Sequence, residues 1–132
     1  MSQSPFGEVN KAKPEIEFPG DTPPSELVLE DIEVGSGAEA TPGATISAHY
    51  VGVAWSTGEE FDASWNRGQP LTFTVGVGQV IQGWDQGLLG MRVGGRRRIT
   101  IPPHLGYGDR GAGAAIKGGE TLIFVVDLVD VR

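Results

Sequence analysis

The chain contains no cysteine, and this absence excludes several kinds of chemistry. Without a thiol there is no disulfide framework, no thiolate nucleophile and no zinc site built on cysteine. A domain of 132 residues does not need such cross-links, because it buries roughly two-thirds of the surface that its unfolded chain exposes. The lack of disulfides suits a reducing compartment, and we expect a cytoplasmic protein.

Long apolar runs and an excess of basic charge are also missing. No stretch approaches the ~20 apolar residues that a membrane-spanning helix needs. Residues 1–10 are polar and acidic, and they lack the basic-then-apolar pattern of a secretory signal. The formal net charge of −7 opposes binding to a phosphate backbone, which requires clustered lysine and arginine. We therefore expect neither a membrane nor a nucleic acid among the partners.

Glycine, by contrast, is abundant, with 21 residues, which is typical of short strands joined by tight turns. Apolar and polar patterning predicts strands at 27–34, 45–55, 61–63, 71–75, 96–101 and 121–131. Helical spacing is found once, where Trp84, Leu88 and Met91 predict a short helix that reaches about Met91 and stops at 93–95. These elements predict an α+β domain, in which the helix packs on an antiparallel sheet of about five strands.

In two of these strands the alternation predicts which side chains share a face. In the strand at 45–55, the two expected faces are Ile46, Ala48 and Tyr50 on one side and Ser47, His49 and Val51 on the other. In the strand at 121–131, one strongly apolar face is expected to hold Leu122, Phe124, Val126 and Leu128. The two faces of the strand at 45–55 are thus expected to differ in character.

The first 25 residues differ in composition from the rest of the chain. They contain five prolines, several acids and few large apolar side chains, which favours a flexible or extended arm. Ile16 and Phe18 are the residues of this arm that could dock on the domain. We therefore divide the chain into an arm at 1–25 and a single domain at 26–132, in which no internal repeat is visible.

Two motifs suggest nucleotide or nucleic-acid binding, and each has a simpler interpretation. Gly76 and Gly78 followed by Gly83 have the wrong spacing for a dinucleotide loop, and neither a parallel βαβ unit nor a phosphate-binding lysine accompanies them. The arginines at 96–98 alternate between two faces of a strand, so an ordinary solvated strand explains them better than a nucleic-acid patch.

The residues that commonly perform chemistry are isolated. His49 and His104 have no ligand spacing around them, so we expect a hydrogen-bonded structural role for His49 and no metal site. Ser47 and Ser64 lack the setting of an activated nucleophile. Asp62 follows an aromatic residue at the point where a short strand breaks, and taken alone it would more often cap a turn than act chemically. The sequence thus predicts no cofactor.

The segment 104–119 has no apolar period and contains six glycines. A loop of this length inside a compact domain is usually functional. It therefore belongs with the candidates for a binding site.

Several short motifs, in their order along the chain, carry a family resemblance: 49–52 (HYVG), 61–64 (FDAS), 78–84 (GQVIQGW), 107–108 (YG), and Ile116 followed by 121–124 (TLIF). From about Leu27 to the last residue, the set resembles the FKBP-type peptidyl-prolyl cis-trans isomerases. The resemblance implies an antiparallel sheet of five to six strands wrapped around one short helix. It also implies an enzyme that rotates the peptide bond before proline.

The resemblance implies a role for each matching position. Trp84 would form the floor of a proline pocket, with Asp62 beside the rotating amide. The Ile81 N–H and the Tyr107 hydroxyl would bind substrate carbonyls, and Arg67 would orient Asp62 and Tyr50. Catalytic roles are thereby expected for Asp62, Trp84, Tyr107 and Phe124, and substrate contacts for Tyr50, Phe61, Arg67, Leu71, Phe73, Gln79, Val80, Ile81, Ala112 and Ile116.

The chain also departs from the well-known members of this family. Leu71 stands where an aromatic wall is common, Gln79 replaces a frequent glutamate and Ala112 a frequent histidine. The resemblance implies that the glycine-rich loop at 104–119 forms a flap over the pocket. Residues 117–119 (KGG) replace a proline pair there, so we expect a more mobile flap tip. Trp65 is expected as an unusual bulky residue next to the pocket rim.

The partners implied by the resemblance are proline-containing peptides and folding proteins, with tacrolimus- or rapamycin-type macrolides as inhibitors. We expect a monomer. The alternative is a binding module or holdase that uses the same pocket without turnover. The altered flap and Leu71 are the features that motivate it.

Overall fold

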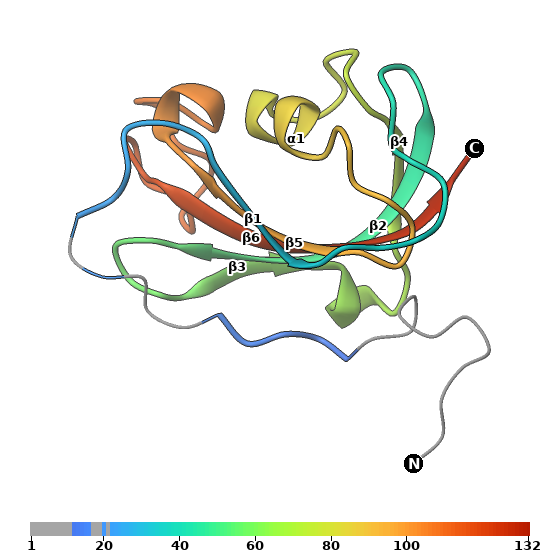
Figure 1. Ribbon diagram of the computed structural model, residues 1–132. Helices are drawn as coiled ribbons and strands as arrows, with labels where there is room; N and C mark the ends of the chain where they lie inside the picture. Colours follow the sequence, from blue (N-terminus) through green and yellow to red (C-terminus); the bar gives the residue numbers. More distant parts are fainter. Residues whose placement is uncertain (1–11, 17–19, 21) are drawn as a thin grey trace.

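The computed structural model describes residues 12–16, 20 and 22–132, and Figure 1 shows one curved sheet with a short helix above it. The strands are β1 (Val28–Glu33), β2 (Thr45–Ala54), β3 (Glu60–Ala63), β4 (Leu71–Thr74), β5 (Arg96–Ile101) and β6 (Leu122–Val131). The helices are α1 (Gln82–Gly87) and two 3₁₀ turns, η2 (Ser64–Arg67) and η3 (Pro103–Leu105). All strand pairs are antiparallel in a six-stranded sheet, which confirms the predicted α+β architecture.

The two longest strands form the centre of the sheet. β6 pairs along β2 on one side and with β5 on the other, and β1 lies at the edge beyond β5. The opposite edge of β2 is shared: β4 pairs with its first half and β3 with its second half. The η2 turn lies between these two short strands in the sequence, so it joins the two parts of the divided edge.

The main core lies on the face of the sheet that α1 covers (Figure 1). The predicted apolar faces of β2 and β6 both contribute to this core, as expected from their alternation. The buried residues from these two strands are Ile46, Ala48, Tyr50, Leu122, Phe124, Val126 and Leu128. The helix packs closely on β5, because Gly83 has no side chain and a Cβ there would lie 2.6 Å from Ile101 side-chain atoms.

The helix is shorter than its apolar spacing predicted. Trp84, Leu88 and Met91 are all buried in the core, but α1 ends at Gly87 rather than near Met91, so that part of the prediction is wrong. The chain leaves the right-handed helical conformation by Gly90, whose φ of +87° is left-handed. The guanidinium of Arg97 donates hydrogen bonds to the carbonyl oxygens of Gly87 (2.7 Å) and Leu89 (3.0 Å). These oxygens therefore have a partner although no further helical turn follows them.

The arginines of β5 are not the solvated residues that the sequence predicted. Arg97 is 9% exposed and also donates to Asp31 (2.7 Å). Arg96 makes two hydrogen bonds with the buried carboxylate of Asp127, at 2.6 and 2.8 Å, on the other face of the sheet. Alternation placed them on opposite faces correctly, but each face supplies a carboxylate that the strand pattern does not reveal. The expectation of an ordinary solvated strand is therefore corrected for these two residues.

Part of the predicted arm lies against the face of the sheet away from α1, which we call the back face (Figure 1). There Ile16 packs on Val51, Ala63 and Val125. Phe18 falls outside the described residues, and the division into arm and domain stays a prediction. None of the helices formed by the described residues is long and apolar enough to cross a membrane.

Candidate functional site

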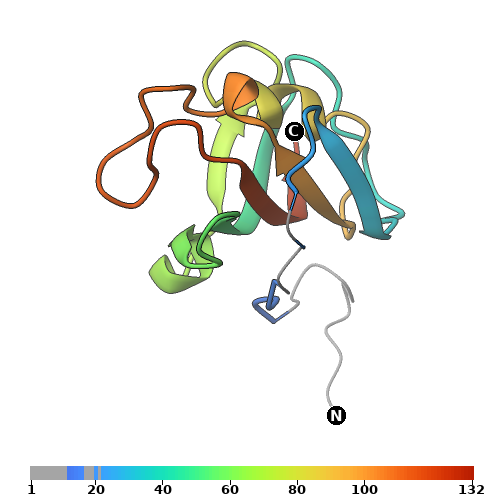
Figure 2. The same cartoon turned by 90° about the vertical axis from the view of Figure 1, so that its left-hand side faces the viewer.

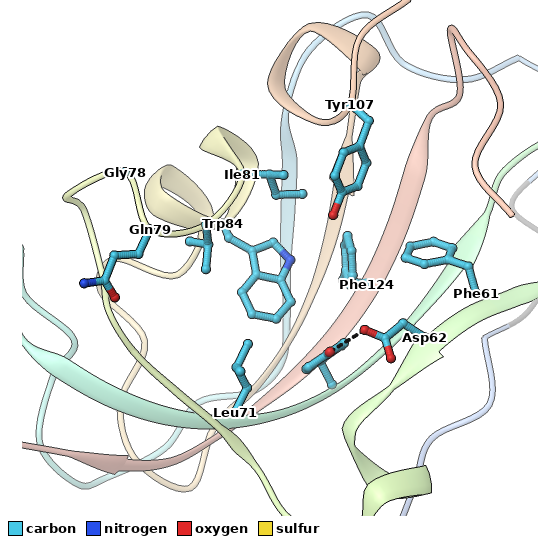
Figure 3. Close-up of a pocket in the computed structure, with 11 residues that line it drawn as sticks. Phe61, Asp62, Leu71, Gly78, Gln79, Ile81, Trp84, Tyr107 and Phe124 are labelled. Atoms are coloured by element: carbon cyan, nitrogen blue, oxygen red, sulfur yellow. Dashed lines mark hydrogen bonds between the residues drawn. The ribbon is translucent and has the colours of Figure 1, made fainter. Parts of the chain in front are cut away.

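A cavity of about 470 Å³ opens above the core face, between α1, the edge of the sheet and the long loop after β5. Figure 3 shows the side chains that converge on it. The lining residues are Tyr50, Phe61, Asp62, Leu71, Gly78, Gln79, Val80, Ile81, Trp84, Tyr107 and Phe124. Apart from Gly78, all of them are among the residues predicted for the site. The sequence motifs, which lie far apart in the chain, thus meet at one opening.

The indole of Trp84 lies at the bottom of the cavity and is 4% exposed (Figure 3). It meets Tyr50 and Phe124 edge-on, with ring centroids 4.9 and 5.2 Å away, and Phe73 lies 5.6 Å away in a tilted arrangement. Each aromatic pair of this kind contributes about 0.5 to 1.5 kcal/mol beyond area burial. The floor is therefore rigid, because rings on three sides hold it.

The buried Trp84 Nε1 has no hydrogen-bond partner among the described residues. An unpaired buried N–H costs about 1 to 3 kcal/mol. Such local costs are expected where a site is shaped for function rather than for stability.

A β-bulge brings an aromatic ring and a carboxylate to the same side of β3. Neighbouring residues of a regular strand face opposite ways, so Phe61 and Asp62 would be separated. In the pairing of β2 with β3, however, Gly52 faces Asp62 and Val53 faces Glu60, which leaves Phe61 as an extra residue. Both side chains consequently line the cavity.

Gly52 makes room for two walls of the cavity. A Cβ at this position would lie 2.6 Å from Phe61 Cζ and 2.7 Å from Phe124 Cε1, closer than real side-chain atoms approach. With hydrogen there instead, the two rings meet edge-on at 5.4 Å. The sequence analysis quoted Gly52 as part of a motif but did not assign it this role. A glycine inside a strand, which marks close approach of another group, was the available signal.

Three polar groups form one edge of the cavity. The Tyr50 hydroxyl donates to Asp62 (2.5 Å), the bond drawn as a dashed line in Figure 3. Arg67 donates to Asp62 (2.8 Å) and to the Tyr50 oxygen (2.8 Å). Burial, and then the hydrogen bond to Asp62, raise the pKa of Tyr50. The hydrogen bonds that Arg67 donates to Tyr50 and to Asp62 raise the pKa of Arg67. The tyrosine stays neutral and the arginine charged, so the carboxylate is held by two donors.

The phenol of Tyr107 lies across the opening from Asp62, with its hydroxyl directed toward the cavity (Figure 3). Burial, and then the charge of Asp62, raise the pKa of this hydroxyl. It therefore remains a hydrogen-bond donor well above neutral pH.

Four predicted residues do not line the cavity. Phe73 lies behind Trp84 in the core, and Arg67 acts on Asp62 and Tyr50 from outside. The two flap residues are also set back: Ile116 is buried against the core, and Ala112 pairs with it across the flap in a short bridge.

Trp65 is not at the pocket rim, and this expectation is wrong. Its ring packs on the back face with Val51 and stacks on His49, with centroids 4.8 Å apart. The reason is that η2 turns the chain after Ala63. Ser64 is thereby directed into the sheet, where its hydroxyl bonds His49 Nδ1, and Trp65 is left on the far side.

The flap, residues 108–119, is the loop that projects at the left of Figure 2. Residues 117–119 form its base rather than its tip, so the expected gain in tip mobility does not apply there. The Gly119 N–H donates to the Gly108 oxygen (2.9 Å), and a Cβ on Gly118 would lie 2.0 Å from the Asp109 oxygen. The base is thus a close backbone crossing that requires glycine.

The turn before α1 is shaped by a residue that the sequence analysis did not single out. Both oxygens of the Asp85 carboxylate accept backbone N–H groups, from Gly76 and from Gly78, each at 2.8 Å. The side-chain oxygen of Gln79 accepts the N–H of Thr74 (2.8 Å). These bonds fix the turn that presents Val80 and the start of α1 to the cavity. Within the described part of the chain, no three potential ligands from His, Cys, Asp and Glu gather closely enough for a metal ion.

Comparison with known proteins agrees with this geometry. The chain is 66% identical to an FK506-binding protein of Streptomyces anulatus over 120 residues, covering 90% of this chain and 97% of the relative. It is 51% identical to a probable FK506-binding protein of Corynebacterium glutamicum over 117 residues, covering 89% and 97%. The crystal structure of AtFKBP13 matches with a TM-score of 0.76 and 45% identity, covering 83% of this chain and 96% of that one.

The model of a protein family described as FKBP-type peptidyl-prolyl cis-trans isomerase matches residues 37–129. This range includes every residue that lines the cavity. The chain therefore belongs to the FKBP-type peptidyl-prolyl cis-trans isomerases, enzymes that interconvert the two isomers of the peptide bond before proline.

Proposed function

We propose that the cavity above Trp84 is the site of prolyl isomerisation and that it accepts proline-containing peptides and folding proteins. The observation that carries this proposal is the enclosure of one opening by five aromatic side chains and a held carboxylate: Tyr50, Phe61, Trp84, Tyr107, Phe124 and Asp62. A cavity of about 470 Å³ lies within the size range of small-ligand sites, so a proline ring with part of its flanking chain fits.

The rate enhancement follows from the polarity of the rotating bond. The planar amide is conjugated and well hydrated, whereas the half-rotated amide has lost its resonance and is less polar. A dry aromatic cavity destabilises the planar form relative to water more than the twisted form, which is differential binding of the transition state. A preference of about 7 kcal/mol would accelerate exchange on the order of 10⁵-fold.

In this proposal the polar groups hold the substrate while one side of the bond turns. The Ile81 N–H and the Tyr107 hydroxyl bind the carbonyls that flank proline, which orients them for rotation. Asp62, held by Tyr50 and Arg67, lies beside the amide and acts through its charge. No bond to the enzyme forms or breaks.

The test is exchange spectroscopy by NMR on a short Leu-Pro or Phe-Pro peptide. Substoichiometric protein should raise the cis–trans exchange rate, and Trp84→Ala and Asp62→Ala should each lower it. Binding of the peptide with exchange left at its spontaneous rate would contradict the proposal. It would favour the holdase alternative, in which suppression of aggregation persists in a pocket variant without isomerase activity.

We further propose that the same cavity binds tacrolimus- or rapamycin-type macrolides and that the protein acts as a cytoplasmic monomer. The names of the relatives support macrolide binding. Leu71 leaves one wall without an aromatic ring, so we expect weaker binding than an aromatic residue there would give. Titration calorimetry of the wild type and of Leu71→Phe tests this, and equal affinities would contradict the role of Leu71. Analytical ultracentrifugation tests the monomer, and fractionation of the producing cells tests the compartment.

A further inference from the structure

The η2 turn connects the cavity to the back face of the sheet. On the cavity side it carries Arg67, whose two hydrogen bonds hold Asp62 and the Tyr50 hydroxyl. Its first residue, Ser64, accepts the backbone N–H of Tyr50 at 2.7 Å. Any shift of η2 therefore moves the donor that orients the carboxylate at the pocket.

The arm contacts the same turn from the other side. Lys13 Nζ lies 2.7 Å from the Glu60 carboxylate and donates to the side-chain oxygen of Asn66 (3.1 Å). Asn66, which directly precedes Arg67, donates in turn to Glu60 (2.8 Å). These three residues form a closed triangle that joins the arm, β3 and η2. The triangle lowers the pKa of Glu60, chiefly through the Lys13 hydrogen bond.

Two further contacts hold residues 12–16 along the back face. Ile16 packs with Trp65 on the patch formed by Val51, Ala63 and Val125. At the other end, the Ala12 oxygen accepts a hydrogen bond from Arg96 (2.8 Å), itself fixed by its buried ion pair. The segment thus crosses from β5 to η2, the region beneath β3 in Figure 1.

We propose that residues 12–16 are a positioning element of the isomerase, which keeps Arg67 on Asp62 and Tyr50 by holding η2 from behind. A 3₁₀ turn has weaker internal hydrogen bonds than an α-helix and depends on its side-chain contacts. The Arg67–Asp62 pair is 46% and 43% exposed, and water competes for both groups. An exposed ion pair is only weakly stable by itself. Contacts that hold η2 in place should therefore raise the fraction of time in which Arg67 and Asp62 are paired.

The test uses the full chain with Lys13→Ala and Ile16→Ala combined. We expect kcat/KM for a Phe-Pro peptide to fall about two- to fivefold, the range that one exposed ion pair contributes. Lys13→Arg with Ile16→Leu should restore most of the rate. Glu15→Ala is the matched control, because Glu15 is an exposed residue of the same segment, and it should leave kcat/KM unchanged. Unchanged kcat/KM in the double variant would overturn the proposal.

A double-mutant cycle with Arg67→Ala separates a positioning role of the arm from a general effect on stability. The inference rests on the role proposed for Arg67, which Arg67→Ala alone tests by lowering kcat/KM. In that background the arm substitutions should cause no further loss, because the pair they support is gone. An equal proportional loss with and without Arg67 would overturn the positioning role while leaving the proposed function intact.

A spectroscopic readout follows the guanidinium directly. In the wild type the side-chain N–H resonances of Arg67 should be resolved, because two acceptors hold the group. In the arm variant they should broaden toward those of a free arginine. Resonances that stayed unchanged would contradict the proposal even if activity fell.

Discussion

At the scale of single residues, the site depends on side chains that keep one protonation state over a wide pH range. Tyr50 and Tyr107 both line the cavity, and burial raises the pKa of both. Arg67 is charged at any pH near neutrality, and its hydrogen bonds to Tyr50 and Asp62 raise its pKa further. The pocket therefore presents the same donors and the same charge at any pH near neutrality.

The hydroxyl of Tyr107 provides the first prediction. Tyr107→Phe keeps the ring but removes one donor, so kcat/KM should fall about two- to tenfold, the value of one neutral hydrogen bond. Stability measured by urea unfolding should change little, because the side chain is 39% exposed. A variant with wild-type kcat/KM would show that this hydroxyl does not bind substrate.

The raised pKa of Tyr107 leads to the second prediction. Since a phenol with a raised pKa stays protonated to higher pH, kcat/KM should be constant between about pH 7 and 9. The measurement is the pH profile of peptide exchange, with Tyr107→Phe as the reference. A fall centred within this range in the wild type, absent from the variant, would mean that the hydroxyl ionises earlier than its burial implies.

At the scale of secondary-structure elements, strands β2 and β5 position the site through contacts on the core face of the sheet. Gly52 on β2 lies beneath the two aromatic walls. Arg97 on β5 ties the end of α1 to the sheet, and α1 carries Trp84. A substitution at Gly52 or Arg97 should therefore shift side chains that line the pocket.

Gly52→Ala is the prediction for β2. The added methyl group would overlap Phe61 and Phe124, and forced overpacking typically costs about 1 to 3 kcal/mol. Both rings would have to move, so kcat/KM should fall together with the free energy of unfolding. Gly58→Ala is the control for substituting a glycine: open space surrounds it, although its φ of +73° imposes strain of its own. It should cost stability without lowering kcat/KM, and an equal kinetic loss in both variants would contradict the role of the walls.

Arg97→Met is the prediction for β5. The variant keeps much of the apolar stem but leaves the oxygens of Gly87 and Leu89 without their donor. Hydrogen bonds to a charged group contribute about 1.5 to 3 kcal/mol each, so the loss of two should lower the free energy of unfolding in urea by about 3 to 6 kcal/mol. Arg98→Met, on the opposite face of the same strand, should lose much less. Equal losses of unfolding free energy in the two variants would mean that the hydrogen bonds from Arg97 to the end of α1 do not stabilise the fold.

At the scale of the whole molecule, the sheet separates two surfaces with different roles. One face carries the core, α1 and the cavity, and the back face carries Trp65, His49 and the arm segment. His49 joins the two through Ser64, whose hydroxyl it bonds at 2.7 Å. The two surfaces are therefore connected through η2 rather than independent.

His49 makes the stability of the molecule depend on pH. Burial, with a smaller contribution from the Arg67 charge, lowers its pKa below 6.5, although the Asp127 charge opposes the shift. The unfolded chain therefore binds this proton more readily than the folded one. The stabilisation is complete above about pH 6.5 and is lost as the pH falls through the lowered folded pKa.

Urea unfolding at about pH 7 and 5 tests this linkage. Wild-type protein should lose more stability on acidification than His49→Gln, because glutamine has no proton to gain. The difference between the two proteins isolates the histidine from the carboxylates that titrate in the same range. Equal losses in the two proteins would contradict the linkage.

The sequence by itself determined the element types, the faces of the central strands and most of the pocket. Alternation in β2 and β6 correctly grouped the side chains that share a face with Tyr50 and with Phe124, since side chains of a strand alternate with a period of two. The ordered motifs identified the cavity residues through their resemblance to the family, because they match its pocket positions in order and spacing. Local sequence patterns were sufficient to predict those features that depend on the local backbone, such as which side chains of a strand share a face.

Tertiary structure alone decided the features that depend on partners distant in the chain. The bulge at Phe61 arises from pairing with β2, and the free carbonyl oxygens at the end of α1 are bound by the guanidinium of Arg97 on β5. The sequence analysis placed Trp65 next to the pocket rim, but the η2 turn directs it to the back face. No local pattern encodes these outcomes, because each results from competition between groups that only the folded sheet brings together.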